Sequence, residues 1–379
     1  MDLKELQDHI RALAATVETD AAVMSCYLNL QNGGVANREF FQNRISLLRK
    51  TLVEPLLRGF EEAVVRTCNY LDTELLAESG GLAVFARGGK EPFFLPLQFQ
   101  VPLPDWIAVG AFPNVFHLVE LKDTYHRFVI LISTEEKAQI LEVTLGEVTQ
   151  KLWRERPQLQ ERIVRGWSKE QYQRHRRHDT ERFFKEKIEV LEKLMNKGGH
   201  KHFILAGSPR LTSQIKQLLP KHLADKLVDS ISTSGGDRLS DIVKMAVTMF
   251  TEEEEQESRA VVEKLMDEIH ANSFGIVGIT GTLRSLQRGS VDILVMAKDF
   301  EAETGWRCRS CRFVGEQHGR LENCPECGTK EIEETDLKEE MIRLAEKYGC
   351  RVEVVNHSDR LMQFQGIGAL LRYYTAEQY

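Results

Sequence analysis

The sequence predicts a mixed α/β (α+β) protein of three domains, with a zinc-binding ribbon inserted in the third. Two observations carry this prediction. Segments whose apolar residues recur at helical spacing alternate with short apolar runs typical of strands. Near the C-terminal end, four cysteines have the spacing of a metal site. The predicted domains are residues 1–125, 126–271 and 272–379, and the ribbon is residues 304–332.

The first domain is predicted to be helical over residues 1 to about 70, where leucines recur at helical spacing. From Gly80 the pattern changes to three short strands: GLAVFA, FFLPLQFQV and DWIAVGAF. The second domain opens with a hairpin formed by RFVILIS and AQILEVTL. Helices and short strands that alternate in this way indicate layered α/β domains.

A basic stretch, residues 151–187, follows the hairpin and holds twelve Lys or Arg against six Asp or Glu. A long helix is expected to begin at Ser168, which with Gln171 fits a capping box, and to end at Gly198-Gly199. HFILAGS then predicts a buried strand, and a further helix runs from about Asp237 to His270. The apolar stripe of the long helix is Phe184, Ile188, Leu191 and Met195.

The third domain alternates strands and helices around the ribbon. SFGIVGI, VDILVMA and RVEVVN predict strands, and TLRSLQRG and LKEEMIRLAEKYG predict helices. The last segment, QGIGALLRYY, predicts a turn from helix to strand. The ribbon is inserted after VDILVMA.

The cysteines form two C-x-x-C pairs separated by twelve residues. Each pair can form a tight turn that points two sulfurs at one metal ion, and two such turns complete a tetrahedral thiolate site. Four thiolates leave no open coordination position, so we expect a structural zinc ion rather than a catalytic one. The predicted ligands are Cys308, Cys311, Cys324 and Cys327.

Three other uses of these cysteines are weaker. Disulfides need an oxidising compartment, and the N-terminal segment lacks a signal-peptide layout. A thioredoxin-like site needs only one C-x-x-C pair. An iron–sulfur cluster could use four cysteines, but two knuckle-like pairs favour zinc. Cys26, Cys68 and Cys350 are most simply reduced core residues.

The bulk properties bound the function. The chain has 379 residues, of which 42% are hydrophobic, and no apolar run approaches the length of a membrane span. We therefore expect a cytoplasmic protein with ordinary cores. The net charge of −7 argues against indiscriminate nucleic-acid binding but is compatible with a local basic patch.

The start of the long helix, GWSKEQYQRHRRH, is the best functional candidate outside the ribbon. Its basic residues, with Trp167 and Tyr172, suit RNA phosphates and unstacked bases. Two interpretations stay open, because a solvated helix face with two buried aromatics explains the same spacing. Gln171 is explained as a capping residue, and His175 and His178 lack further ligands at metal spacing.

Several segments, taken in order, carry a family resemblance. HFILAGSPRLTSQIKQLLPKHLADKLVDSIST, TGTLRSLQRGSVDILVMAKDF and the closing QFQGIGALLRYY resemble the archaeal and eukaryotic class-1 peptide chain release factors and their relative Pelota. The ribbon occupies the place of that family's insertion in its third domain. The chain looks most like the divergent bacterial branch of the superfamily, which includes the ribosome hibernation factor Balon. The resemblance covers nearly the whole chain and implies a release-factor-like architecture.

The sequence departs from the family where the family's chemistry lies. In the release factors, a G-G-Q tripeptide precedes a basic helix, and its Gln helps water to attack peptidyl-tRNA. Here that position reads Arg165-Gly166-Trp167, and Lys169 stands where some bacterial relatives have a Gln. The residues that the resemblance and the basic pattern assign to RNA contact are Arg165, Gly166, Trp167, Ser168, Gln171, Tyr172, Arg174, His175, Arg176 and Arg177.

The first domain departs as well. The family's stop-codon motif N-I-K-S would fall near Phe40 to Asn43, which reads FFQN. Its Y-x-C-x-x-x-F motif would end at Phe116, but Gly110 and Phe112 replace the Tyr and the Cys. The resemblance therefore does not imply stop-codon reading.

Together, these features predict a monomeric ribosome-binding translation factor that contacts rRNA in the A site during hibernation or rescue. The resemblance implies that its third domain contacts a translational GTPase such as elongation factor Tu, and no membrane is involved. One alternative is a release or rescue factor that hydrolyses peptidyl-tRNA, with Gln171 or another group orienting water, so the question of enzymatic activity stays open. A second alternative is an RNA-binding module that does not act on the ribosome.

Overall fold

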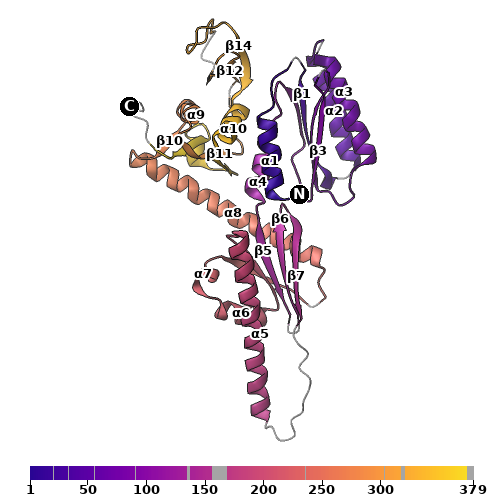
Figure 1. Ribbon diagram of the computed structural model, residues 1–379, viewed down its shortest axis with the longest axis vertical. Coiled ribbons are helices and arrows are strands. Elements are labelled where there is room, and N and C mark those ends of the chain that lie inside the picture. The colour runs from indigo at the N-terminus through magenta and orange to yellow at the C-terminus, as the bar shows by residue number, and fades with distance from the viewer. Residues whose placement is uncertain are drawn as a thin grey trace. The chain divides into compact units, whose positions relative to one another are not determined.

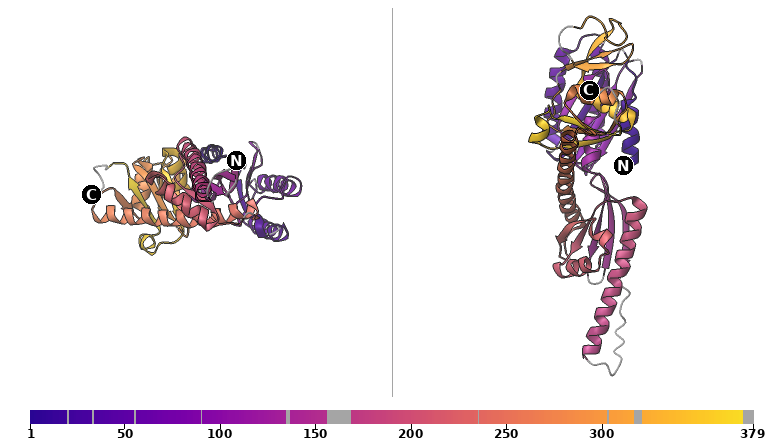
Figure 2. Two further views of the ribbon diagram at one scale, coloured as in Figure 1. Left: turned by 90° about the horizontal axis from the view of Figure 1, so that it is seen from below. Right: turned by 90° about the vertical axis from the view of Figure 1, so that its left-hand side faces the viewer.

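The computed structural model describes residues 1–19, 21–32, 34–54, 56–89, 91–134, 137–155, 169–234, 236–302, 304–316 and 321–373. The chain forms two compact units (Figures 1 and 2). One unit combines residues 3–124 with residues 254–379, and the other is residues 125–253. The mixed α/β fold is confirmed, whereas the predicted boundaries of three domains stay a prediction. No helix among the described residues combines the length and apolar character that crossing a membrane requires.

The N-terminal part of the first unit is an antiparallel sheet with helices packed on it. The sheet has the order β3-β2-β1-β4, and the buried side chains of α3 and β2 share one core cluster. The elements are α1 (Leu3–Ala14), β1 (Val23–Asn29), a 3₁₀ turn (Leu30–Asn32), α2 (Gly34–Thr51), α3 (Leu56–Thr73), β2 (Gly81–Arg87), β3 (Phe93–Phe99), β4 (Trp106–Gly110) and α4 (Phe116–Thr124).

Strand β1 was not predicted, because it lies inside the stretch that the sequence predicts to be helical. It reads VMSCYLN, and its first six residues are buried. It pairs with β2 on one side and β4 on the other, so it is an interior strand. A continuously apolar strand of this kind has no period-2 pattern to distinguish it from a buried helical segment. The three strands predicted from Gly80 onward are confirmed.

The second unit is a five-stranded sheet buried on both faces. Its order is β7-β6-β5-β8-β9, and the predicted hairpin of β5 and β6 is confirmed. Along β5, Val129 and Leu131 face one core with α5, and Phe128 and Ile130 face the other with α8. The elements are β5 (Phe128–Ser133), β6 (Lys137–Thr144), β7 (Glu147–Glu155), α5 (Lys169–Gly198), β8 (Phe203–Gly207), α6 (Pro209–Leu218), α7 (Lys221–Ala224), β9 (Leu227–Ser232) and α8 (Leu239–His270).

The C-terminal part of the first unit contains a mixed sheet and the ribbon. The mixed sheet has the order β10-β16-β11-β15, with β11 and β15 parallel. The ribbon is a separate three-stranded sheet between β11 and α10 in the chain. The elements are β10 (Gly275–Val277), α9 (Ile279–Gln287), β11 (Val291–Ala297), β12 (Thr304–Cys308), β13 (Val314–Glu316), β14 (Ile332–Asp336), α10 (Leu337–Tyr348), β15 (Arg351–Val355), α11 (Asp359–Met362) and β16 (Ile367–Leu371).

Candidate metal centre and the basic helix start

The ribbon sheet places the first cysteine pair. β12 is its central strand, with β13 and β14 on either side, and it ends at Cys308. Trp306 on this strand is buried against Cys308 and Cys324, and its indole N–H donates to the Glu316 carbonyl at 3.0 Å. A Cβ added at Gly315 would lie 2.6 Å from the Trp306 ring, so a side chain there would displace the indole. The small residue and the large ring together hold the cysteine end of the ribbon.

The two C-x-x-C turns have the same backbone hydrogen bonds. In each, the residue four positions after the first cysteine donates its N–H to that cysteine's carbonyl: Arg312 to Cys308 at 2.8 Å, and Gly328 to Cys324 at 2.9 Å. In each, the first cysteine's N–H donates to the carbonyl five positions later, at 2.9 Å and 2.8 Å respectively. Arg312 and Gly328 both have the left-handed backbone, with φ of 62° and 73°. We call residues 308–312 the first knuckle and residues 324–328 the second knuckle.

The knuckles bring four sulfur atoms together. The four lie within 4.8 Å of one another, with Cys308 Sγ 3.6 Å from Cys327 Sγ and Cys311 Sγ 3.6 Å from Cys324 Sγ. A tetrahedral zinc site with Zn–S bonds of about 2.3 Å has sulfur–sulfur edges of about 3.8 Å, whereas a disulfide joins its sulfurs at about 2.0 Å. All seven cysteines are free thiols. The donor set and its spacing therefore fit a tetrahedral metal ion.

The thiols of the cluster differ in acidity. Desolvation raises the pKa of the Cys308 thiol, but hydrogen bonds from the Cys311 backbone N–H and from neighbouring thiols outweigh it and lower the pKa to about 7. The Phe313 backbone N–H lowers the pKa of the Cys311 thiol, yet desolvation and hydrogen bonds to the other sulfurs bring it to about 12. Of these two thiols Cys308 therefore ionises more readily, and the thiolate is the form that binds metal.

Arg307, the residue before Cys308, ties the ribbon to the rest of its unit. Its side chain is only 8% exposed and forms ion pairs with Glu18 at 2.9 Å, with Glu340 at 3.4 Å and with Glu333. Glu18 follows α1, and Glu340 lies on α10. Arg309 pairs with Glu18 and Glu333 as well, but it is 60% exposed.

Phe112 lies beneath this network. The Arg307 guanidinium is 4.2 Å from the centre of the Phe112 ring, and the Arg343 guanidinium is 3.6 Å from it. Sequence reasoning had treated Phe112 only as a departure from a family motif. The structure gives it a cation–π role between the N-terminal part of the unit and the ribbon.

A buried carboxyl joins α10 to α4. Asp336 caps α10 by accepting the Glu339 N–H, and the Glu339 carboxyl accepts the backbone N–H of Val115 at 3.0 Å. Burial raises the pKa of the Glu339 carboxyl to about 8, although the Val115 hydrogen bond acts in the opposite direction. Glu339 and Val115 are 224 residues apart in sequence, so no local pattern could have indicated this contact.

The basic helix start lies mostly outside what the structure describes. Arg165, Gly166, Trp167 and Ser168 are outside the described residues. Residues 171–177 belong to the helical backbone of α5, but their side chains are also outside the description. The predicted stripe is confirmed further along the helix, where Phe184, Ile188, Leu191 and Met195 are buried in the core.

The described side chains of α5, which begin at residue 181, anchor its C-terminal part to the core. Within α5, the first described side chain that is buried is that of Phe183. The buried Lys187 donates to the Ser133 hydroxyl at 2.8 Å and lies 3.8 Å from the centre of the Phe183 ring. A helix of 30 residues is about 45 Å long, and Figures 1 and 2 show α5 extending past the ends of the strands. The chain positions that carry the basic residues are therefore at the far end of the helix.

The positions of the stop-codon motifs lie on or beside helices and strands of the first unit, and Gln42, Asn43 and Gly110 among them are exposed. Phe40 to Asn43 lie within α2, where Phe41 is buried. Gly110 ends β4, and Phe116 begins α4 and is buried. Outside the ribbon, Cys26 and Cys350 are buried and Cys68 is half-buried, and all three are free of disulfides.

Two family models match the chain, one after the other. "Bacterial archaeo-eukaryotic release factor family 10" matches residues 113–251, and "eRF1 domain 3" matches residues 255–375. The second match contains the four-cysteine ribbon.

Similar proteins include peptide chain release factor subunit 1 of Thermococcus onnurineus. It is 27% identical over 236 residues, which cover 55% of this chain and 57% of that protein. The same protein of Pyrococcus abyssi is 27% identical over 235 residues, with the same coverage of both chains. The chain thus matches little more than half the length of these relatives.

Among solved structures, the archaeal translation termination factor aRF1 aligns over 98% of this chain and 99% of its own, at 16% identity and a TM-score of 0.29. Dom34 of S. cerevisiae aligns over 78% of this chain and 81% of its own, at 13% identity and a TM-score of 0.41. The two family models lie between residue 113 and residue 375, and the sequence relatives are named as release factors as well. The chain belongs to the superfamily of archaeal and eukaryotic class-1 release factors and Pelota.

Proposed function

We propose that this protein is a ribosome-binding translation factor that occupies the A site in hibernation or rescue and does not read stop codons. The observation that carries the proposal is its superfamily membership, established by adjacent matches to a release-factor family and to a release-factor domain. The curated relatives are named as peptide chain release factors. By the same resemblance, its partner would be a translational GTPase such as elongation factor Tu, contacted through residues 272–379.

The sequence at the start of α5 favours a role without hydrolysis. The tripeptide position reads Arg165-Gly166-Trp167, so the Gln that helps water attack in the release factors is replaced. Basic residues with an adjacent tryptophan suit contact with rRNA phosphates and bases. The length of α5 beyond its buried half supports the proposal, because it would carry these residues away from the core of their unit.

The ribbon is proposed to hold a structural zinc ion. Cys308, Cys311, Cys324 and Cys327 would be its ligands, and their sulfur spacing supports this assignment. Zinc would contribute folding free energy to the ribbon and leave no open position for a substrate. Its role would be to fix the shape of an arm that reaches from the third domain.

Sedimentation on sucrose gradients tests the ribosome assignment. Tagged full-length protein from growing and starved cells is expected to co-migrate with ribosomes. A triple variant, Arg174→Gln/Arg176→Gln/Arg177→Gln, is expected to lose most of this co-migration because each position removes a phosphate contact. The matched control is Lys185→Gln/Lys193→Gln/Lys197→Gln, which removes the same charge from exposed positions of the same helix. Wild-type protein that never sediments with ribosomes would refute the assignment.

A release assay tests the absence of hydrolysis. Purified protein is added to stalled ribosomes that carry labelled peptidyl-tRNA, and the freed peptide is measured. No release above the rate without protein is expected. Release that disappears in a Gln171→Ala variant would show instead that this glutamine orients the attacking water.

A further inference from the structure

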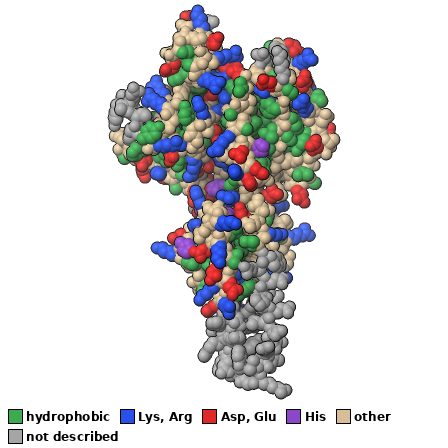
Figure 3. Space-filling model, in the orientation of Figure 1, with side chains coloured by type: hydrophobic (Ala, Val, Ile, Leu, Met, Phe, Trp, Pro, Cys, Tyr) green, Lys and Arg blue, Asp and Glu red, His purple; other side chains and the backbone are tan. Residues whose placement is uncertain are grey.

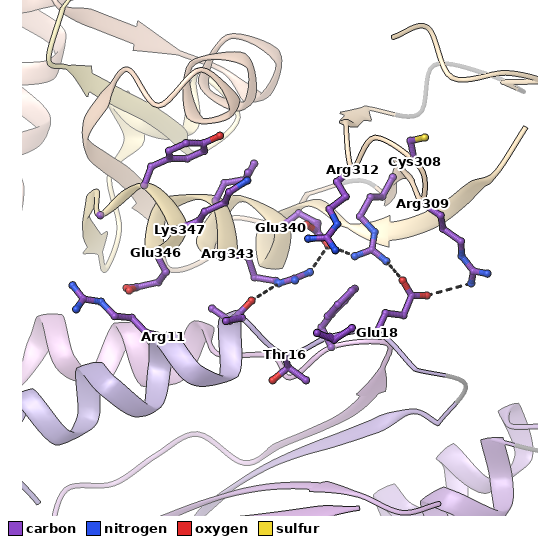
Figure 4. A pocket seen from close by; sticks show the side chains of 18 residues that line it. Arg11, Thr16, Glu18, Cys308, Arg309, Arg312, Glu340, Arg343, Glu346 and Lys347 are labelled. Carbon is purple, nitrogen blue, oxygen red and sulfur yellow. Dashed lines mark hydrogen bonds and ion pairs between the residues drawn. The ribbon is translucent and has the colours of Figure 1, made fainter. Parts of the chain in front are cut away.

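A cleft in the first unit lies between the C-terminal end of α1, the first knuckle and α10. Its volume is about 890 Å³, within the range of small-ligand sites. Figure 4 shows basic side chains reaching toward it from all three elements. The basic residues of its lining are Arg11, Arg307, Arg309, Arg312, Arg343 and Lys347.

Half of these cations are neutralised within the protein. Arg307 pairs with Glu18, Glu333 and Glu340, and Arg309 pairs with Glu18 and Glu333. Arg343 pairs with Glu340 at 3.1 Å. The last acidic residue of the lining, Glu346, accepts from Gln7 at 2.6 Å and pairs with Lys122, which lies outside the lining. The carboxylates of the cleft are therefore already engaged.

The other three cations, Arg11, Arg312 and Lys347, have no acidic partner in the part of the chain that the structure describes. All three are exposed. They come from α1, the first knuckle and α10 respectively, so they surround the cleft rather than follow one helix. On the face drawn in Figure 3, by contrast, Lys and Arg are interspersed with Asp and Glu. On a chain of net charge −7, such a convergence is a local positive field.

The backbone at Arg312 is independent evidence for the use of its charge. Arg312 has a φ of 62°, a conformation that disfavours side chains other than glycine. The equivalent position of the second knuckle is Gly328. Glycine would therefore be the less strained residue at 312. Strained positions cluster at functional sites, and at position 312 the strained residue carries a cation at the cleft.

The remaining lining suits nucleotides better than an acidic peptide. Tyr348 is half-buried beside Lys347 and Val17 is 68% exposed, whereas the Phe112 ring already lies against the Arg307 and Arg343 guanidiniums. Guanidinium planes and aromatic rings stack on unpaired bases, while neighbouring cations bind the phosphates. We propose that this cleft binds the phosphates and bases of a short single-stranded RNA segment. The choice of RNA rests on the proposed function, which would bring this unit against ribosomal RNA.

Fluorescence anisotropy of the full-length protein with a labelled ten-nucleotide oligouridylate tests the cleft directly. The background carries the Arg174, Arg176 and Arg177 to Gln substitutions, so that α5 does not contribute. The test variant adds Arg11→Gln, Arg312→Gln and Lys347→Gln. The matched control adds Lys50→Gln, Arg66→Gln and Lys264→Gln, which are exposed basic residues outside the cleft.

The test variant is expected to bind RNA at least about tenfold more weakly at low salt. The slope of log affinity against log salt should fall by about 2, since each contact to single-stranded RNA contributes about 0.7. The control should stay within about twofold of the background. Equal binding by test and control variants would overturn the proposal. Displacement of RNA by oligoglutamate of equal length, at concentrations where unlabelled RNA fails, would assign the cleft to an acidic protein and also overturn it.

This experiment uses no ribosomes, so it fails separately from the proposed function. RNA binding that depends on the cleft, in a protein that never sediments with ribosomes, would support the cleft and refute the ribosomal role. Ribosome binding that survives the cleft substitutions, together with unchanged oligouridylate affinity, would refute the cleft and support the ribosomal role. Thermal melting of each variant confirms that the exposed substitutions leave the fold intact.

Discussion

The two knuckles of the ribbon have nearly the same backbone but very different surroundings. Both turns make the same pair of hydrogen bonds and place the fifth residue in the left-handed region. The first knuckle contains Arg309 and follows directly on Arg307, and these two arginines pair with glutamates of three other segments. The second has exposed residues from Pro325 to Gly328. The conformation of each turn thus depends on its C-x-x-C sequence. Docking of the ribbon onto the rest of its unit depends instead on the arginines in and beside the first knuckle.

Binding of the proposed zinc ion and docking of the ribbon onto the rest of its unit thus depend on different residues. Loss of the zinc ion should have the largest effect on the stability of the ribbon. Cys308→Ser removes one of the four proposed zinc ligands, and structural zinc contributes on the order of 10 kcal/mol to folding in isolated modules. We expect residues 304–336 to lose hydrogen-exchange protection and the bound metal, measured by mass spectrometry. Residues 125–253 should keep their protection, and their unfolding would contradict the ribbon's place as a separate arm.

Docking of the ribbon onto the rest of its unit should depend on Arg307 much more than on Arg309, although both arginines pair with the same two glutamates. Arg307→Ala removes the most buried cation of the network, although Arg309 and Arg343 still pair with its three glutamates, and should cost about 2 kcal/mol in the stability of the first unit. Arg309→Ala is the matched control, because a surface pair of this exposure is worth about 1 kcal/mol or less. Urea unfolding of both variants measures the difference. Similar losses would mean that the ribbon is not held by the buried arginine.

The packing of α10 beside α4, which Glu339 supports, should weaken as pH rises. Its folded pKa of about 8 lies above the ordinary value of 4.5, so its contribution is complete below about pH 4.5 and is lost as pH rises through 8. Between these values the stability of the wild type should fall by up to about 1.4 kcal/mol per pH unit relative to Glu339→Gln. The glutamine stays neutral and can still accept the Val115 N–H. Parallel pH profiles for the two proteins would refute the raised pKa.

The smallest effect on the stability of the ribbon should come from substitutions at Arg312 and Gly328, the left-handed residues that differ between the knuckles. Gly328→Ala places a Cβ in the left-handed region and should destabilise the ribbon by about 1 kcal/mol. Apart from its neighbours in the chain, no atom of the described residues lies within 4 Å of that Cβ, so we expect only the backbone to be affected. Arg312→Gly should stabilise the ribbon by up to about 1 kcal/mol for the converse reason. Competition with a chelator measures both, and a change of the same sign in both variants would show that the knuckles are not equivalent.

The sequence predicted features that depend on short spacings. The four cysteines, the stripe of α5 and the hairpin of β5 and β6 all follow from neighbours within about twenty residues. Strand β1 was missed, because a continuously apolar strand lacks the alternation that identifies exposed strands. The left-handed Arg312 was missed as well, because only the match between the two folded knuckles reveals it.

Contacts between distant parts of the chain had no sequence signal. Glu18 and Arg307 are 289 residues apart, and Val115 and Glu339 are 224 apart. Phe112 was interpreted through the motif it lacks, while the structure uses its ring under two guanidinium groups. The RNA-contact residues of the α5 start stay a prediction, because they rest on resemblance and charge rather than on described side chains.

The strands that enter and leave the ribbon begin and end side by side. Thr304, the first residue of β12, pairs with Asp336, the last residue of β14. Asp336 is at the same time the residue that caps α10, so no linker separates the arm from the helix. A displacement of the ribbon is consequently expected to move the start of α10 with it. A force that a binding partner applies at the knuckles would reach Glu339 and Val115 without passing through a flexible joint.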